Sequence, residues 1–249
     1  MISLIAVDGI PEIQPGDDLA ALIEAALRDA GMGLEAGDVL VVTQKVVSKA
    51  EGRVVELASV TPRQEATEWA AQWGKDPRQV ELVLQESAEV LRMATGGLII
   101  SRTRHGFVCA NAGVDLSNVG RGDVATLLPV DPDASARGLR DRLGELTGAQ
   151  PAVVISDSFG RPWRNGIVNV AIGCAGLEAL VDLRGTEDAD GRLMHSTVIA
   201  VADELASAAD LAGGKVTRRP VVIVRGYEHA AGENGAAALV MDREMDLFP

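Results

Sequence analysis

The chain is organised around one stretch, Val153-Val-Ile-Ser-Asp157-Ser158-Phe-Gly-Arg161-Pro-Trp-Arg164-Asn-Gly166. The apolar residues 152–155 predict a buried strand, and the polar and glycine residues after them predict a loop. Asp157 and Ser158 carry the hard oxygen atoms that Mg2+ and Mn2+ prefer, and Arg161 and Arg164 could hold phosphate or carboxylate oxygens. The alternative is an aspartate that caps a turn beside solvated arginines, and the stretch alone does not decide between them.

The composition is typical of a globular protein. The chain has 249 residues, 47% of them hydrophobic and 24% charged, so one large domain or two interleaved domains can form a sizeable core. The formal net charge of -13 argues against nucleic acid or an anionic membrane as the main partner, because both select a basic surface. Anionic ligands would therefore need local clusters of lysine and arginine, or metal ions.

The N-terminal residues and the cysteines predict a soluble, cytoplasmic protein. Residues 1–7 have neither the basic region nor the cleavage site of a signal peptide, and no apolar run approaches the length of a membrane span. Cys109 and Cys174 lie among apolar or small residues. This setting predicts buried thiols in a reducing compartment rather than a disulfide or a zinc site.

Hydrophobic periodicity predicts a mixed α/β fold. Strands are expected at residues 2–7, 38–43, 152–155, 197–202 and 220–224, and helices at 19–27, 61–92, 133–148 and 205–211. Asp133 or Ser135 is expected to cap the third of these helices. Residues 98–100 and 107–110 predict a hairpin, whereas residues 167–180 fit either a packed helix or strands.

Further polar residues follow the predicted strands. Lys45 and Lys49 are four residues apart, so a helical turn would place both on one face, where they could meet two phosphates or form a solvated pair. Asp115 and Asn118 stand in a second loop, which alone is typical of a turn with a hydrogen-bonded aspartate. The chain lacks the standard phosphate-loop and dinucleotide motifs. Two aspartate loops beside basic loops fit a divalent metal with phosphate binders around it, as phosphoryl transfer requires.

Six ordered segments carry a resemblance to a known family. They are residues 9–13 (GIPEI), 46–52 (VVSKAEG), 110–119 (ANAGVDLSNV), 127–133 (LLPVDPD), 156–166 (SDSFGRPWRNG) and 201–210 (VADELASAAD). Together they resemble the coenzyme F420-0:L-glutamate ligases, also called F420 gamma-glutamyl ligases. One such segment would be a weak signal, but six in order across nearly the whole chain are specific.

The resemblance implies a GTP-dependent ligase of coenzyme F420 biosynthesis. GTP would phosphorylate the terminal carboxylate of F420-0, the amine of L-glutamate would attack the acyl phosphate, and GDP and phosphate would leave. The resemblance further implies two divalent ions, Mg2+ or Mn2+, and an intertwined homodimer with the site near its interface. Residues 1–249 would form a single ligase domain of two interleaved subdomains, without the C-terminal flavin-binding domain of actinobacterial relatives.

The resemblance also assigns residues to the site. By position, Asp115 and Asp157 match metal ligands, and Ser158 matches a ligand of a second metal ion. The nucleotide contacts match Ile10, Pro11, Glu12, Ile13, Thr43, Gln44, Lys49, Asn118, Gly213, Gly214 and Lys215. Gln44 stands where a serine is frequent in the family. Lys45, Arg161 and Arg164 are candidate contacts of the acceptor substrate.

Two other functions remain open at this point. One is a ligase that adds glutamate to a different acceptor, and the other is a non-catalytic nucleotide- or metal-binding protein on the same scaffold. The sequence assigns no general base to the incoming amine. Glu86, Asp203 and Glu204 are acidic candidates in apolar surroundings.

Overall fold

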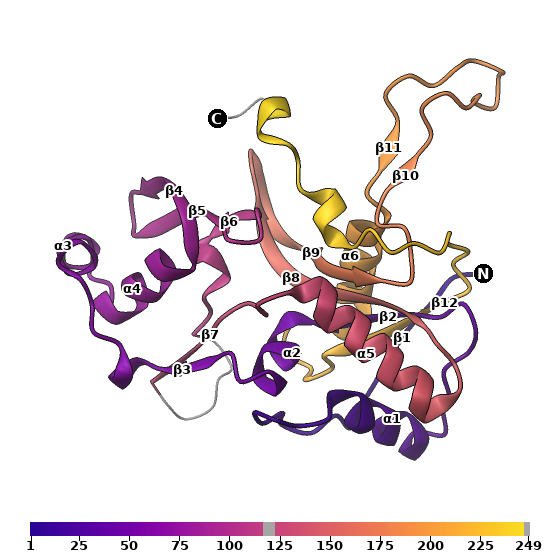
Figure 1. Cartoon of the computed structure of the whole chain (residues 1–249), viewed down its shortest axis with the longest axis horizontal. Helices are drawn as coiled ribbons and strands as arrows, with labels where there is room; N and C mark the ends of the chain where they lie inside the picture. Colours follow the sequence, from indigo (N-terminus) through magenta and orange to yellow (C-terminus); the bar gives the residue numbers. More distant parts are fainter. Residues whose placement is uncertain (117–122, 247–249) are drawn as a thin grey trace.

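The central element of the fold is a mixed five-stranded sheet (Figure 1). The structure, a computed structural model, describes residues 1–116 and 123–246. The strand order is β1-β12-β2-β8-β9, with β1 (Ser3–Ala6), β2 (Val39–Thr43), β8 (Ala152–Arg161), β9 (Arg164–Ala175) and β12 (Val221–Arg225). β2 and β8 run parallel, and the other neighbours are antiparallel. The structure therefore confirms the predicted mixed α/β class.

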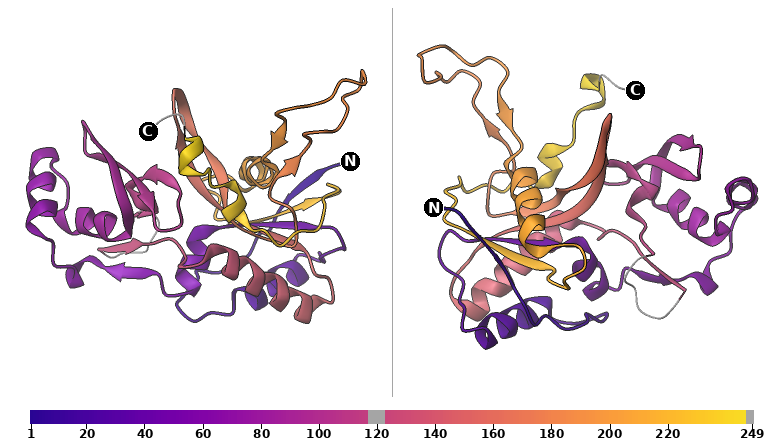
Figure 2. Two further views of the ribbon diagram at one scale, coloured as in Figure 1. Left: turned by 45° about the horizontal axis from the view of Figure 1, so that its top comes forward. Right: turned by 180° about the vertical axis from the view of Figure 1, so that it is seen from behind.

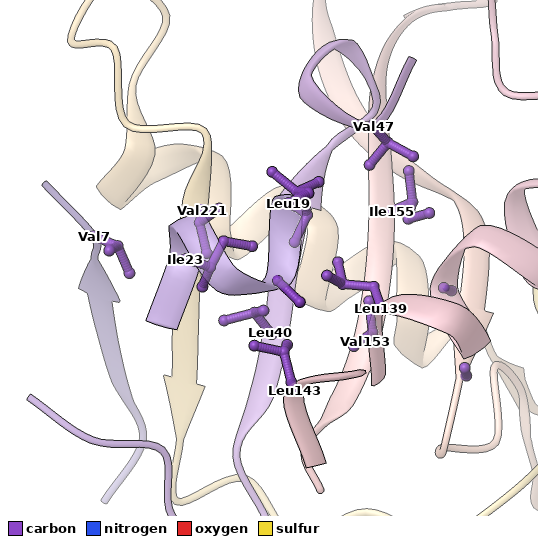
Figure 3. Packing of buried hydrophobic residues seen from close by; sticks show 14 of the residues in the cluster. Val7, Leu19, Ile23, Leu40, Val47, Leu139, Leu143, Val153, Ile155 and Val221 are labelled. Atoms are coloured by element: carbon purple, nitrogen blue, oxygen red, sulfur yellow. The ribbon is translucent and has the colours of Figure 1, made fainter. Parts of the chain in front are cut away.

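Helices cover both faces of this sheet, which explains why its inner strands are continuously apolar. α1 (Leu19–Asp29) and α5 (Pro132–Thr147) pack on one face, together with α2 (Gln44–Ala50). α6 (Val201–Gly213) packs on the other. Along β2, Leu40 and Val42 point to the α1/α5 side, whereas Val39 and Val41 point to α6. Figure 3 shows the first of these two cores, where Leu139 and Leu143 of α5 lie against the sheet.

The chain between α2 and α5 forms a lobe beside the sheet (Figures 1 and 2). It contains α3 (Gln64–Trp73), α4 (Pro77–Glu86), a sheet of β4 (Ser87–Ala94), β5 (Leu98–Thr103) and β6 (Val108–Ala110), and the pair β3 (Val54–Glu56) and β7 (Val124–Thr126). Its buried residues, from Leu57 to Leu127, form a hydrophobic cluster of their own. The predicted division into interleaved subdomains stays a prediction, and this lobe is the segment to which it would apply.

The sequence-based interpretation of residues 156–161 as a loop was wrong. β8 continues through them to Arg161 and pairs with β9, so that Asp157 lies opposite Val170. Sequence periodicity did not reveal the pairing because the partner strand β9 consists of residues 164–166, which were assigned to the loop, and of part of the stretch 167–180, which fitted either helix or strand. The chain reverses only at Pro162 and Trp163, and Trp163 takes a left-handed φ of 57°. Asp157 is therefore held within β8, which is paired there with β9, rather than by a flexible loop.

Other element boundaries also differ from the prediction. The helical stretch 61–92 ends at Glu86, because Ser87 begins β4, which finds a partner in β5. The strand expected at 197–202 is only β11 (Val198–Ile199), and α6 begins at Val201. The boundary between α3 and α4 follows local signals. The left-handed Gly74 ends α3, and Asp76 caps the start of α4 before Pro77.

The cap of α5 is Asp131 rather than Asp133 or Ser135. The side chain of Asp131 accepts a hydrogen bond from the backbone N–H of Ala134 at 2.9 Å. Asp133 instead accepts from the backbone N–H groups of Cys174 at 2.8 Å and Ala236 at 2.7 Å. Its carboxylate thus joins α5 to β9 and to the C-terminal segment, a long-range role that no local pattern predicts.

The short pair β10 (Val181–Asp182) and β11 forms the base of an arm. Residues 183–197 continue this arm away from the body, and all three views show its end far from the central sheet (Figures 1 and 2). None of the helices within residues 1–116 and 123–246 is both long enough and apolar enough to cross a membrane.

A core substitution on α5 tests the packing of this helix on the sheet. Leu143→Ala removes a side chain that is fully buried, with 0% exposed, against the sheet. We expect a loss of about 2–5 kcal/mol in the free energy of unfolding, measured by urea denaturation. Leu146→Ala on the same helix is the control, because Leu146 is 38% exposed and should change stability by less than about 0.5 kcal/mol. Equal losses in the two variants would contradict this packing.

Candidate active site

A cavity of about 900 Å3 lies where the central sheet meets the lobe. Its wall combines the end of β2, the start of α2, the middle of β8 and β9, the segment after β6, and residues 214–220. The parallel pairing of β2 with β8 places Thr43 beside Ser156, so the two strands lead into α2 and Asp157 at the same edge. This is the carboxyl edge of a parallel pair, where ligands commonly bind in α/β folds.

Two carboxylates face the cavity from different parts of the chain. Asp157 comes from β8, and Asp115 is held by backbone hydrogen bonds with Thr126 of β7, at 2.8 and 3.0 Å. Burial raises the pKa of Asp157 to about 6, against the backbone hydrogen bond from Ser158, and the negative charge of Asp115 adds to the rise. Lys215 and a hydrogen bond from Gln44 lower the pKa in turn. A cation between the two carboxylates would offset both their desolvation and their repulsion.

Basic side chains stand beside these carboxylates. Lys45 pairs with Asp115 at 2.7 Å, and Lys49, which is buried, pairs with Glu12 at 2.5 Å. Both lysines come from α2, and both line the cavity as the four-residue spacing suggested. Lys215, Arg218 and Arg219 approach from the loop after α6. An acidic chain thus concentrates positive charge at one place, as the binding of anionic phosphates requires.

A hydrogen-bonded chain crosses the floor of the cavity. Lys215 donates through its ammonium group to Ser158 Oγ, and Ser158 Oγ donates to Asn169 Oδ1 at 2.7 Å. Asn169 Nδ2 donates to Asp210 Oδ1 at 3.2 Å. This network fixes the orientation of the Ser158 hydroxyl beside Asp157.

The chain matches one protein family over most of its length. The family model described as F420-0:Gamma-glutamyl ligase matches residues 9–226. The protein belongs to this family. The family that the six segments predicted is thereby confirmed.

Curated relatives agree with the family model. A protein of Methanothermobacter thermautotrophicus called coenzyme F420:L-glutamate ligase is 48% identical, over 99% of this chain and 98% of its own. Proteins of the same name from Methanopyrus kandleri and Archaeoglobus fulgidus are 45% and 42% identical, over 95% and 99% of this chain and 93% and 96% of theirs. Similarity therefore covers both the sheet and the lobe that meet at the cavity.

Most of the residues that sequence analysis selected for this family's site come together in the cavity wall. They are Ile10, Pro11, Glu12, Ile13, Thr43, Gln44, Lys45, Lys49, Asp115, Asp157, Ser158, Gly214 and Lys215. Gly213 is buried at the end of α6 and does not line the wall. Arg161 and Arg164 lie at the tip of the β8–β9 hairpin, outside the wall, where Arg161 bonds to the carbonyl of Asn165 at 2.7 Å. Asn118 lies outside the described residues.

Sequence reasoning missed several residues of the wall, namely Asn169, Asp210, Arg218 and Arg219, and it interpreted Cys109 only as a core thiol. The adjacent basic residues 218 and 219 were themselves a visible signal in the sequence. Arg219 pairs with Asp8 at 2.6 Å. Cys109 is buried as expected, and burial, with the charge of Asp157, raises the pKa of its thiol to about 12. Asn169 carried no such signal, since β9 brings it to the site from a segment without a motif, and Asp210 stands at the end of the segment 201–210, to which the resemblance assigned no role.

The residues present fit a metal ion that shares its coordination with a phosphate. Among the described residues there is no cluster of three or more His, Cys, Asp and Glu side chains that could form an all-protein metal cage. Mg2+ typically takes one or two carboxylates and completes its coordination with water and substrate phosphates. Asp115, Asp157 and the Ser158 hydroxyl supply such a partial set of oxygen ligands.

A left-handed turn directs the chain from β6 to Asp115. Asn111, Ala112 and Gly113 have φ values of 51°, 51° and 72°, and Asn111 Oδ1 accepts a hydrogen bond from the backbone of Ile99 at 3.2 Å. A Cβ atom on Gly113 would lie 2.7 Å from Cγ of the buried Leu128. Only glycine fits this position, and the turn is what carries Asp115 into the wall.

The close approach at Gly113 can be tested against a second left-handed glycine. Gly148, at the end of α5, has a similar φ of 73°, but a Cβ atom there would have no neighbour within 4 Å. Alanine costs about 1–2 kcal/mol at either position because of the left-handed backbone, and overpacking adds about 1–3 kcal/mol at Gly113 alone. We therefore expect Gly113→Ala to destabilise the protein more than Gly148→Ala in urea denaturation. Equal losses would disprove the contact with Leu128.

Proposed function

We propose that the protein joins L-glutamate to coenzyme F420-0 through a gamma-linked amide, with GTP and a divalent metal ion, in F420 biosynthesis. The observation that carries the proposal is the pair Asp115 and Asp157 facing one cavity among lysines and arginines, in a chain of net charge -13. The names of the family and of the relatives supply the acceptor and the amino acid. GTP, F420-0 and L-glutamate all carry anionic groups, and the amine of glutamate is the exception among their charged groups. This charge agrees with the basic residues of the wall.

The proposed reaction has two steps. The terminal carboxylate of F420-0 attacks the γ-phosphorus of GTP. GDP departs as the leaving group, and F420-0 becomes an acyl phosphate. The amine of L-glutamate then attacks the acyl carbon, the bond to phosphate breaks, and inorganic phosphate leaves. Asp115, Asp157 and Ser158 would hold one or two Mg2+ or Mn2+ ions, which supply charge neutralisation and in-line alignment of the phosphates. Lys45, Lys49 and Lys215 can exchange their present partners for phosphate oxygens.

The remaining assignments belong to the same proposal. GTP would contact residues 10–13, Thr43, Gln44, Lys49, Asn118 and residues 213–215. Arg161 and Arg164 would bind the acceptor if the tip of the β8–β9 hairpin reached a cavity. This cavity would be that of the same chain or that of a second subunit in a homodimer. The projecting β10–β11 arm offers a surface for contact with such a second subunit. The buried free thiols of Cys109 and Cys174 agree with a cytoplasmic location.

The function is tested by an endpoint assay with mass spectrometry. Purified protein is incubated with F420-0, L-glutamate, GTP and Mn2+ or Mg2+, and each component is omitted in turn. We expect products heavier by whole glutamyl units that depend on every component. GTP turnover that depends on glutamate but leaves F420-0 unchanged would indicate a different acceptor. Nucleotide binding without turnover would indicate a non-catalytic protein.

The metal assignment is tested by Asp157→Asn. Loss of a partner that only orients a metal ligand typically costs 10–100-fold, so we expect loss of a direct ligand to lower glutamate addition by more than about 100-fold. Mn2+ binding, followed by calorimetry, should weaken as well. Asp29→Asn, on the exposed end of α1, is the matched control. Wild-type turnover of Asp157→Asn at saturating metal would refute the assignment.

A further inference from the structure

Asp210 is a carboxylate of the cavity wall that the reaction described so far does not use. It lies in the last turn of α6 and accepts the hydrogen bond from Asn169 Nδ2 at 3.2 Å. Asn169 is only 4% exposed, and its Oδ1 is occupied by the hydroxyl of Ser158. Ser207 Oγ also donates to the Asn169 carbonyl at 2.6 Å. The buried amide therefore holds Asp210 in a fixed position beside the proposed metal and phosphate site.

Asp210 differs from the other acidic residues of the wall in its partners. Glu12 is paired with Lys49 and Asp115 with Lys45, and Asp157 is assigned to the metal. Within the part of the chain that the structure describes, Asp210 forms no ion pair, although Lys215 and Arg218 line the same cavity. The ammonium group of Lys215 is directed to Ser158 instead.

The end of α6 adds to the negative potential at this place. The last carbonyls of a helix carry a partial negative charge, which favours cations. Many helices place a basic side chain in the last turn, but α6 has none there. A cationic ligand group beside Asp210 would complement both the carboxylate and the helix end.

Charge decides which substrate group can occupy this place. The phosphates of GTP and the phosphodiester and carboxylate of F420-0 would be repelled by Asp210 and attracted to the lysines. The α-ammonium group of L-glutamate is the cationic group among the proposed substrates. It must also lie close to the phosphorylated carboxylate, and the hydrogen-bonded chain from Asp210 to Ser158 provides that proximity.

We propose that Asp210 binds the α-ammonium group of L-glutamate and accepts its proton as the amide forms, an inference that rests on the proposed function. The ammonium group first loses one proton to solvent, which frees the nitrogen lone pair. The lone pair then forms the bond to the acyl carbon, and the acyl carbon–oxygen bond to phosphate breaks; the second proton of the former ammonium group is the one that Asp210 takes up. The nitrogen becomes far more acidic once it is bonded to that carbon, so a carboxylate can take up the proton. Asn169 is the positioning residue for Asp210.

The acidic candidates from the sequence do not lie in the cavity wall. Glu86 pairs with Arg53 at 2.7 Å, and Asp203 accepts a hydrogen bond from the backbone of Ala171 at 2.8 Å. Glu204 is exposed on α6. Their positions leave Asp210 as the carboxylate of α6 that can reach an incoming amine.

The test separates amine activation from formation of the acyl phosphate. Hydroxylamine is a neutral nucleophile near neutral pH, so it can trap an acyl phosphate as a hydroxamate without a group that binds an ammonium ion. With F420-0, GTP and Mg2+, Asp210→Asn should form hydroxamate and GDP at the wild-type rate. With L-glutamate in place of hydroxylamine, we expect ligation to fall by about 10²–10⁴-fold, the usual contribution of general acid–base catalysis. KM for L-glutamate should rise, and KM for GTP should not change.

Glu204→Gln, on the same helix but exposed, is the matched control and should retain both activities. Asp210→Ser serves as a second variant, and a wild-type Tm shows that each variant is folded. Equal loss of both activities in a folded variant, or wild-type ligation of L-glutamate, would overturn the proposal. If the wild-type protein itself forms neither hydroxamate nor GDP, the acyl-phosphate step of the proposed function fails, a result distinct from failure of Asp210.

Discussion

The parallel pairing of β2 with β8 is the constraint on which the rest of the structure depends. Its register sets Thr43 beside Ser156, and both strands are buried between helices on two faces. Parallel strands deliver the residues that follow them to the same edge, so α2 with its lysines and Asp157 with Ser158 become neighbours there. These segments are more than 100 residues apart in sequence, and no local interaction could bring them together.

The second constraint is that the lobe must close one side of the cavity. Asp115 belongs to the lobe, and its backbone pairs with Thr126 while its side chain reaches Lys45 of α2. The left-handed turn at residues 111–113 and the buried Leu128 determine where Asp115 lies. The pair of carboxylates at the centre of the proposed reaction thus depends on packing between two hydrophobic clusters, not on one motif.

Charge distribution connects this architecture with the proposed chemistry. The chain as a whole is strongly acidic, yet lysine and arginine side chains of α2 and of the loop after α6 converge on the cavity. The carboxylates beside them are of three kinds. Glu12 and Asp115 are paired with lysines, and burial raises the pKa of Asp157. Asp210 lies at the end of α6, whose last turn has no basic residue. Such separation of positive and negative subsites is what a reaction between anionic phosphates and an amine requires.

The sequence by itself determined the family, the mixed α/β class and many of the polar and charged residues of the cavity wall. It could do so because buried strands are continuous apolar runs, and because the residues after them, Thr43 to Lys49 and Asp157 with Ser158, form recognisable segments. Only the tertiary structure decided that residues 156–161 are strand, that β4 begins at Ser87, and that Asp133 anchors the C-terminal segment. Strand pairing and long-range hydrogen bonds overrode local polarity and periodicity at these places. The same reason applies to Asn169 and Asp210, whose position in the wall follows from β9 and α6 packing together, a contact that no neighbouring residue in sequence specifies.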